Sequence, residues 1–124
     1  MTKKLFPGVF EIPCGHIDFG EDIVEGLKRE VREETGKDNI VGDPFSSFTY
    51  MNEVKGAHAI EVAYFARFAD RLDGIKIEPA DHMDYGWFSE ADEHKFTVNR
   101  KPDEPEIAVI RRGFALLAGK QLRF

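Results

Sequence analysis

The segment Gly15–Lys37 restricts most strongly what this chain can fold into. Residues 15–20 begin and end with glycine, which is typical of a loop because glycine adopts backbone conformations that other residues avoid. We predict a helix over about residues 22–35, with Gly36 as its C-terminal stop. Apolar residues recur at every fourth position of this helix and give it one apolar stripe, which consists of Ile23, Leu27 and Val31.

Three acidic residues of the predicted helix, Glu30, Glu33 and Glu34, stand at i, i+3 and i+4 and therefore share one adjoining face. Each like-charged pair on a solvated helix costs roughly 0.2–0.5 kcal/mol. A hard divalent cation relieves this repulsion, and carboxylate oxygens suit Mg²⁺ or Mn²⁺. Most glutamate-rich helices are only solvated faces, so the three carboxylates alone leave a metal site and a charged surface as alternatives.

The complete spacing of the segment decides between these alternatives. In one-letter code the segment is GHIDFGEDIVEGLKREVREETGK. Five residues separate the first glycine from a glutamate, and seven more separate that glutamate from the triplet REV. One residue then separates REV from the pair EE, and one residue separates EE from the last glycine. This arrangement resembles the Nudix box, the signature of the Nudix (MutT-like) hydrolases. One slot departs from the family, because Lys37 stands where an apolar residue is usual. Just upstream, Pro13-Cys14-Gly15 replaces the common Pro-Gly-Gly.

The resemblance implies an activity and a set of ligands. Nudix enzymes split a diphosphate linkage and release a nucleoside monophosphate from a nucleoside diphosphate joined to another group. By this resemblance, Glu30, Glu33 and Glu34 are expected to bind Mg²⁺ or Mn²⁺, and Glu33 is the first choice for the general base. The family also uses a backbone carbonyl at the position of Cys14, and a carbonyl ligand does not depend on the side chain.

Arg29 and Glu21 complete the catalytic residues that the resemblance implies. They are eight residues apart, which is too far for an i,i+4 pair on a helix. The resemblance implies that they form a bridge between loop and helix that holds the loop in place.

Many family members recruit a further carboxylate from a loop a few residues before a tryptophan-containing strand. The corresponding tryptophan is Trp87, and Asp81 is the first candidate for the ligand, followed by Glu78 or Asp84. The alternative is that these are loop acids and that Trp87 belongs to the core.

Other residues that could carry chemistry have simpler explanations. No base is indicated beside Cys14, so a packed loop residue is a better interpretation than a nucleophile. The four histidines share no metal-ligand spacing: His16, His58, His82 and His94. Four aromatic residues of the expected strands could stack on a base, although strand aromatics more often fill a core: Phe48, Tyr50, Tyr64 and Phe65.

Composition limits the number of domains, the partners and the location that we expect for this chain. With 124 residues, of which 42% are hydrophobic, we expect one small Nudix-like domain over residues 1–124. The net charge of −6 argues against general nucleic-acid binding. It leaves a small nucleotide substrate open, because a bound metal supplies positive charge. The single cysteine excludes an internal disulfide and fits a cytoplasmic location, and no apolar run or signal peptide indicates a membrane.

The rest of the chain alternates irregularly between strands and helices. Expected strands cover residues 45–51, 57–68, 75–77 and 85–88, and the second should be buried on much of both faces. Expected turns cover residues 38–44, 52–56 and 70–74. A short helix is expected around residues 90–94, capped by Ser89, and a last helix over about 105–118. The apolar face of the last helix should consist of Ile107, Ile110, Phe114 and Leu117.

This order of elements favours an α/β/α sandwich around a mixed sheet, as the resemblance also implies. Only 14 residues precede Gly15, whereas family members usually carry thirty or more residues with one or two strands there. We therefore expect a sheet that lacks the usual N-terminal strands. Either a second copy of the chain covers the open edge in a homodimer, or the sequence is a fragment of a longer protein.

Two functions from different classes follow. The first is a metal-dependent pyrophosphohydrolase that acts on a nucleoside diphosphate derivative, since all three glutamates are present. The alternative is a Nudix-fold nucleotide-binding or structural module without hydrolysis, which the short N-terminal segment and Lys37 favour. No subfamily mark outside the box identifies the nucleotide substrate.

Overall fold

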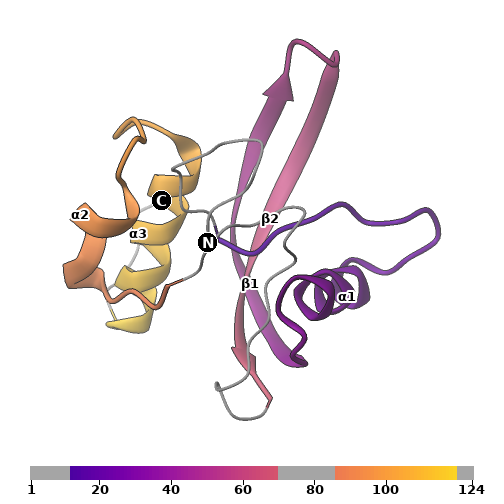
Figure 1. The fold of residues 1–124 in the computed structure, drawn as a ribbon, viewed down its shortest axis with the longest axis horizontal. Coiled ribbons are helices and arrows are strands. Elements are labelled where there is room, and N and C mark those ends of the chain that lie inside the picture. Colours follow the sequence, from indigo (N-terminus) through magenta and orange to yellow (C-terminus); the bar gives the residue numbers. More distant parts are fainter. Residues whose placement is uncertain (1–11, 70–85, 120–124) are drawn as a thin grey trace. The chain divides into compact units, whose positions relative to one another are not determined.

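The computed structural model describes residues 12–69 and 86–119, and its elements combine helices with one antiparallel hairpin (Figure 1). In chain order they are α1 (Ile23–Thr35), β1 (Asn39–Asn52), β2 (Ala57–Phe68), a 3₁₀ turn η1 (Glu90–Asp92), α2 (Glu93–Phe96) and α3 (Pro105–Leu117). The predicted α/β class is confirmed, with two strands among the described residues. In the described part of the chain, no helix is long and apolar enough to cross a membrane.

The chain divides into two compact units. One comprises the described residues of Met1–Val41 and Ala66–Arg100, and the other those of Gly42–Phe65 and Lys101–Phe124. The single-domain organisation stays a prediction. The predicted turn over 70–74 and the strand over 75–77 lie outside the described residues.

Helix α1 begins and ends where local chemistry dictates. The side chain of Asp22 accepts hydrogen bonds from the amides of Val24 and Glu25 at 3.0 and 3.3 Å, which caps the first turn. At the other end Gly36 has φ of 73°, in the left-handed region, and its amide donates to the carbonyl of Arg32. The predicted bounds of this helix are confirmed to within one residue.

The apolar stripe of α1 is only partly buried. Val31 is buried and Leu27 is half-buried, whereas Ile23 is exposed. Thr35 is fully buried, and its hydroxyl donates to the carbonyl of Val31 at 2.7 Å, which satisfies the polar atom inside the unit.

Strands β1 and β2 form the predicted hairpin, drawn as two long neighbouring arrows in Figure 1. Gly56 closes the turn with φ of 64°, and its amide donates to the carbonyl of Glu53. The predicted turn over 38–44 is wrong, because β1 already begins at Asn39. Pro44 lacks an amide proton. In the described part of the chain the sheet has two strands, so β1 has an edge without a partner strand, where proline is tolerated. A Cβ on Gly42 would lie 3.3 Å from the carbonyl oxygen of Phe65, so glycine permits this close strand approach.

Two further strand expectations are wrong. Strand β2 is not buried on both faces, since Ile60 is 76% exposed and Val62 is also exposed. The described part of the predicted strand over 85–88 has no strand structure; Trp87 and Phe88 instead make edge-to-face ring contacts with Phe68 and Phe96. Side-chain packing of these rings explains why aromatic residues gather there without strand pairing.

The predicted helix at residues 90–94 is present as η1 followed by α2. Ser89 and Asp92 form a reciprocal capping box, in which the Asp92 carboxylate accepts from the Ser89 amide at 2.9 Å. Phe96 is buried at the end of α2.

Helix α3 belongs to the second unit and packs through small and apolar positions. Ile107, Val109 and Gly113 are buried, whereas the predicted face residue Leu117 is 72% exposed. A Cβ on Gly113 would lie 3.2 Å from the ring of Phe45, which stacks on Phe65 with centroids 4.2 Å apart. The helix therefore approaches an aromatic pair through a glycine, a pairing that apolar periodicity does not predict.

Candidate active site

The loop before α1 is fastened to the helix by a two-point ion pair. Arg29 donates from Nε to Glu21 Oε2 at 2.8 Å and from Nη2 to Glu21 Oε1 at 3.0 Å. This fork geometry matches a planar guanidinium to a carboxylate and fixes both orientation and distance. The bridge that the resemblance implies between loop and helix is therefore present.

The same two side chains also hold the backbone of the loop. Nη2 of Arg29 donates to the carbonyl of His16 at 3.0 Å, and the amide of Asp18 donates to Glu21 Oε1 at 3.0 Å. The Asp18 carboxylate lies 3.5 Å from Arg29. The roles of His16 and Asp18 do not follow from the sequence, because they depend on backbone groups and on the shape of the loop.

Two glycines make room for these contacts. Gly26 is buried in α1, and a Cβ there would lie only 2.8 Å from Glu21 Oε1. A Cβ on Gly15 would overlap the side chain of Glu30. Gly26 is not among the predicted site residues, although a glycine in a helix interior, which costs up to about 1 kcal/mol, signals a close approach.

The ion pair changes the titration of its members. Two hydrogen bonds from Arg29 lower the pKa of the Glu21 carboxyl below its usual range, and the hydrogen bond from the Asp18 amide lowers it further. The hydrogen bonds to Glu21, followed by those to Glu33 and Glu30, raise the pKa of Arg29. Both groups therefore stay charged near neutral pH.

The third nitrogen of Arg29 brings two of the predicted metal ligands together. Nη1 lies 3.0 Å from Glu30 Oε1 and 3.1 and 3.2 Å from the two carboxylate oxygens of Glu33. The Glu33 side chain is 59% exposed, whereas that of Glu30 is 20% exposed. A single positive group thus lies between two carboxylates, one of which faces solvent.

The other predicted ligands of the first unit have different surroundings. Glu34 is buried, at 7% exposure, on the side of α1 that also buries Val31 and Thr35. Cys14 is half-buried in the segment that enters the loop. The predicted ligand Asp81 and its alternatives, Glu78 and Asp84, lie outside the described residues.

The donor chemistry fits a hard divalent cation in part. Glu30 and Glu33 supply carboxylate oxygens and already share one positive charge, that of Arg29. Among residues 12–69 and 86–119, however, no group of three or more His, Cys, Asp or Glu side chains is arranged to hold a metal ion. A cation bound by both carboxylates would therefore compete with Nη1 of Arg29 for the same oxygens.

The remaining candidates have structural roles or exposed positions. Trp87 is 57% exposed, so it is not a buried core residue. Phe65 stacks on Phe45, as expected for a core aromatic, while Tyr50 is exposed and Tyr64 half-buried. Of the histidines, His82 lies outside the described residues.

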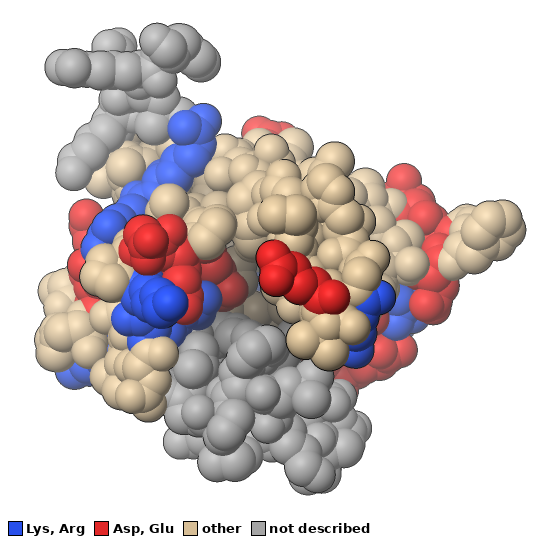
Figure 2. Space-filling view, turned by 90° about the horizontal axis from the view of Figure 1, so that it is seen from above, with Lys and Arg blue, Asp and Glu red and all other residues tan. Residues whose placement is uncertain are grey.

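Charged side chains of both signs lie next to one another on the face shown in Figure 2, and the described residues form no continuous basic surface on that face. This mixture fits the net charge of −6.

Comparison with known proteins identifies a matching family. The family model described as the NUDIX domain matches residues 1–112. The chain belongs to the Nudix family. In this Nudix chain, the matched residues include the loop and helix built around Arg29.

Individual relatives match a shorter stretch of this Nudix chain. The nucleoside triphosphatases NudI of Salmonella schwarzengrund (strain CVM19633) and Salmonella agona (strain SL483) are each 35% identical to it over 54 residues. NudI of Salmonella arizonae is 33% identical over 54 residues. Each match covers 44% of this chain but only 38% of the relative's length. No solved structure matches the chain.

Proposed function

We propose that this Nudix chain is a metal-dependent pyrophosphohydrolase that cleaves the diphosphate linkage of a nucleoside diphosphate derivative and releases a nucleoside monophosphate. The observation that carries the proposal is the assembly in which Arg29 joins Glu21, Glu30 and Glu33 at distances of 2.8 to 3.2 Å. Family membership and partial similarity to proteins named nucleoside triphosphatase support the same type of reaction.

In this proposal, Mg²⁺ or Mn²⁺ is held by Glu30, Glu33 and Glu34, with the carbonyl of Cys14 and the carboxylate of Asp81 as further ligands. When bound, the ion neutralises charge on the phosphoryl oxygens and makes a bound water more acidic. Glu33 is the proposed general base, because its side chain is the most exposed of the three that accept hydrogen bonds from Arg29, namely Glu21, Glu30 and Glu33, and water can reach it.

Arg29 and Glu21 act in this proposal by preorganisation. Their paired hydrogen bonds and the bond to the His16 carbonyl hold the loop against α1 before a substrate arrives. Because the loop is already ordered, substrate binding does not incur the entropy cost of ordering the loop, and this is the main advantage of a rigid site.

A substrate panel tests the proposal. ADP-ribose, nucleoside triphosphates, NADH and dinucleoside polyphosphates are incubated with the protein in Mg²⁺ and, separately, in chelator, and the products are identified by chromatography and ³¹P NMR. We expect a nucleoside monophosphate from at least one substrate in Mg²⁺ and none in chelator. Cleavage that is equal in chelator would contradict metal dependence.

The second candidate is a Nudix-fold nucleotide-binding or structural module without hydrolysis. It is favoured by the position of Arg29 Nη1 between Glu30 and Glu33, and by the lack of a three-ligand metal cluster among the described residues. Nucleotide binding in Mg²⁺ with no product from any member of the panel would decide for this candidate.

A further inference from the structure

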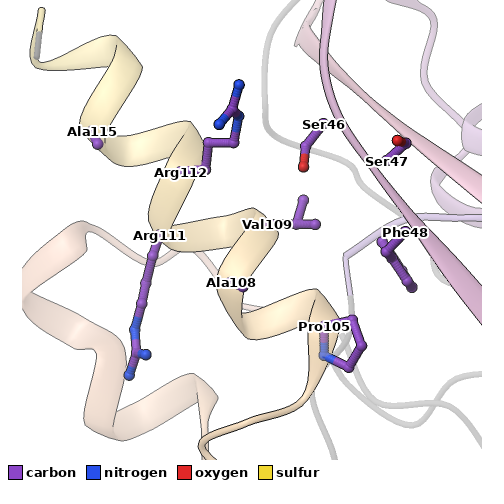
Figure 3. A pocket seen from close by; sticks show the side chains of 9 residues that line it. All are labelled: Ser46, Ser47, Phe48, Pro105, Ala108, Val109, Arg111, Arg112 and Ala115. Carbon is purple, nitrogen blue, oxygen red and sulfur yellow. The ribbon is translucent and has the colours of Figure 1, made fainter. Parts of the chain in front are cut away.

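A pocket of about 540 Å³ lies within the second unit, between β1 and α3 (Figure 3). Nine residues line it: Ser46, Ser47, Phe48, Pro105, Ala108, Val109, Arg111, Arg112 and Ala115. The chain contains 23 aspartates and glutamates, yet none of the lining residues is acidic and two are arginines. The charged residues of the lining are therefore both cations, in a protein with a net charge of −6.

Arg112 is the arginine that is positioned to bind a ligand. Its Nε donates to the carbonyl of Phe45 at 2.8 Å, which fixes the plane of the guanidinium against β1. The structure gives Arg112 no other hydrogen bond to a described residue, so Nη1 and Nη2 remain available as a pair of donors. In Figure 3 Arg112 lies on the side of α3 that faces β1, whereas Arg111 extends in another direction.

The walls of the pocket supply one further donor and an apolar surface. Ser46 lies on β1 opposite Val109 (Figure 3), and it is half-buried, whereas Ser47 is exposed. Val109 is 3% exposed and forms an apolar floor with the neighbouring alanines of α3. The ring of Phe48, one of the predicted base-stacking residues, forms part of the same wall.

We propose that this pocket binds a small organic phosphate, with the phosphate on Arg112 and Ser46 and the apolar or aromatic body against Val109 and Phe48. A phosphate monoester carries three terminal oxygens and close to two negative charges at neutral pH, which matches a guanidinium fork plus a hydroxyl. A ring or other apolar body covers the remaining wall, and aromatic stacking adds to its binding. This site is independent of the proposed hydrolysis and requires no metal.

The experiment measures AMP, adenosine and inorganic phosphate binding in the presence of chelator, by calorimetry and by amide chemical shifts of the labelled protein. Chelator removes any contribution from divalent metal, so failure of hydrolysis and failure of this pocket are separate results. We expect AMP to bind more tightly than either fragment and to shift amides of residues 46–48 and 106–115.

Substitutions distinguish the contribution of the phosphate to binding from that of the rest of the ligand. Arg112→Gln should weaken AMP binding by about tenfold or more while changing adenosine binding by less than about twofold. Ser46→Ala keeps the Arg112–Phe45 bond and should weaken AMP by about threefold, so the proposal stays testable if Arg112→Gln does not fold. Lys55→Gln removes the same charge from the hairpin turn and should leave AMP binding unchanged.

Three results would overturn the proposal. One is that neither AMP nor phosphate binds at millimolar concentration. Another is that AMP binds equally well to the wild type, Arg112→Gln and Ser46→Ala. The third is that AMP shifts only amides of residues 12–36, which would place it at the Nudix box.

Discussion

Glu21 and Arg29 act as a unit at the residue scale, and the charge of Glu21 is what holds the unit together. The hydrogen bonds from Arg29 and from the Asp18 amide lower the pKa of Glu21 in the folded protein. A carboxyl whose folded pKa is depressed adds stability above its ordinary value of about 4.5 and loses it as pH falls through the folded value. The ion pair therefore stabilises the loop at neutral pH and not in strong acid.

Glu21→Gln should accordingly lower the melting temperature at pH 7, and the difference from the wild type should shrink as pH falls from about 5 to 2. Thermal melts across this range measure it. Glu25→Gln is the matched control, because among the described residues the Glu25 side chain pairs only with Lys28, at 3.7 Å on the exposed side of α1. A difference between wild type and Glu21→Gln that is the same at pH 2 and pH 7 would contradict the ion pair.

At the scale of elements, the end of helix α1 depends on the left-handed backbone conformation of Gly36. Most other residues adopt this conformation only at a cost in free energy. The φ of 73° at Gly36 ends the helix and turns the chain toward β1. Gly36→Ala should lower the free energy of unfolding by about 1–2 kcal/mol, because a Cβ disfavours the left-handed region. Chemical denaturation measures the change.

Asparagine tolerates the left-handed region better than alanine, so Gly36→Asn should lose less stability than Gly36→Ala. Equal stability of the wild type and Gly36→Ala would show that the helix does not need this cap. That result would also weaken the account of why α1 ends where it does.

Local signals explain which elements the sequence predicts well. The cap residues Asp22 and Gly36 act within one or two turns, so the bounds of α1 follow from the sequence. The start of β1 does not follow, because Gly42 and Pro44 signal a turn locally and pairing with β2 overrides them. Exposure of Ile60 and Leu117 is likewise set by what lies opposite them, which periodicity does not reveal.

In the candidate site, too, some features follow from the sequence and others depend on the folded structure. The box spacing identifies Glu21, Arg29 and the three glutamates through a family resemblance, but not how Arg29 divides its nitrogens among them. The contact between Arg29 and Glu33 is an i,i+4 pair within α1, whereas the burial of Glu34 depends on tertiary packing. Asp81, which is predicted from its position a few residues before Trp87 in the sequence, lies outside the described residues and stays a prediction.

At the scale of the whole molecule, metal binding should couple to folding. If Mg²⁺ or Mn²⁺ binds only the folded chain, it stabilises the fold by mass action, by about 2.7 kcal/mol at a hundredfold excess over Kd. The melting temperature should therefore rise with Mn²⁺ and fall to a baseline with chelator. Ca²⁺ should also raise it while supporting little catalysis, because its coordination is looser. Identical melting temperatures with Mn²⁺ and with chelator would contradict a metal site.

The most direct test of the central claim compares Glu33→Gln with the wild type in the hydrolysis of the best substrate of the panel. Glu33 pairs with Arg29 on an exposed helix face, so its substitution should cost little stability, about 0.5 kcal/mol. We predict that kcat falls by more than about a hundredfold if Glu33 binds metal or accepts the proton of water. Glu25→Gln, the same substitution elsewhere on α1, should keep nearly the wild-type rate. Near-normal rates for both variants would contradict catalysis by the Nudix box.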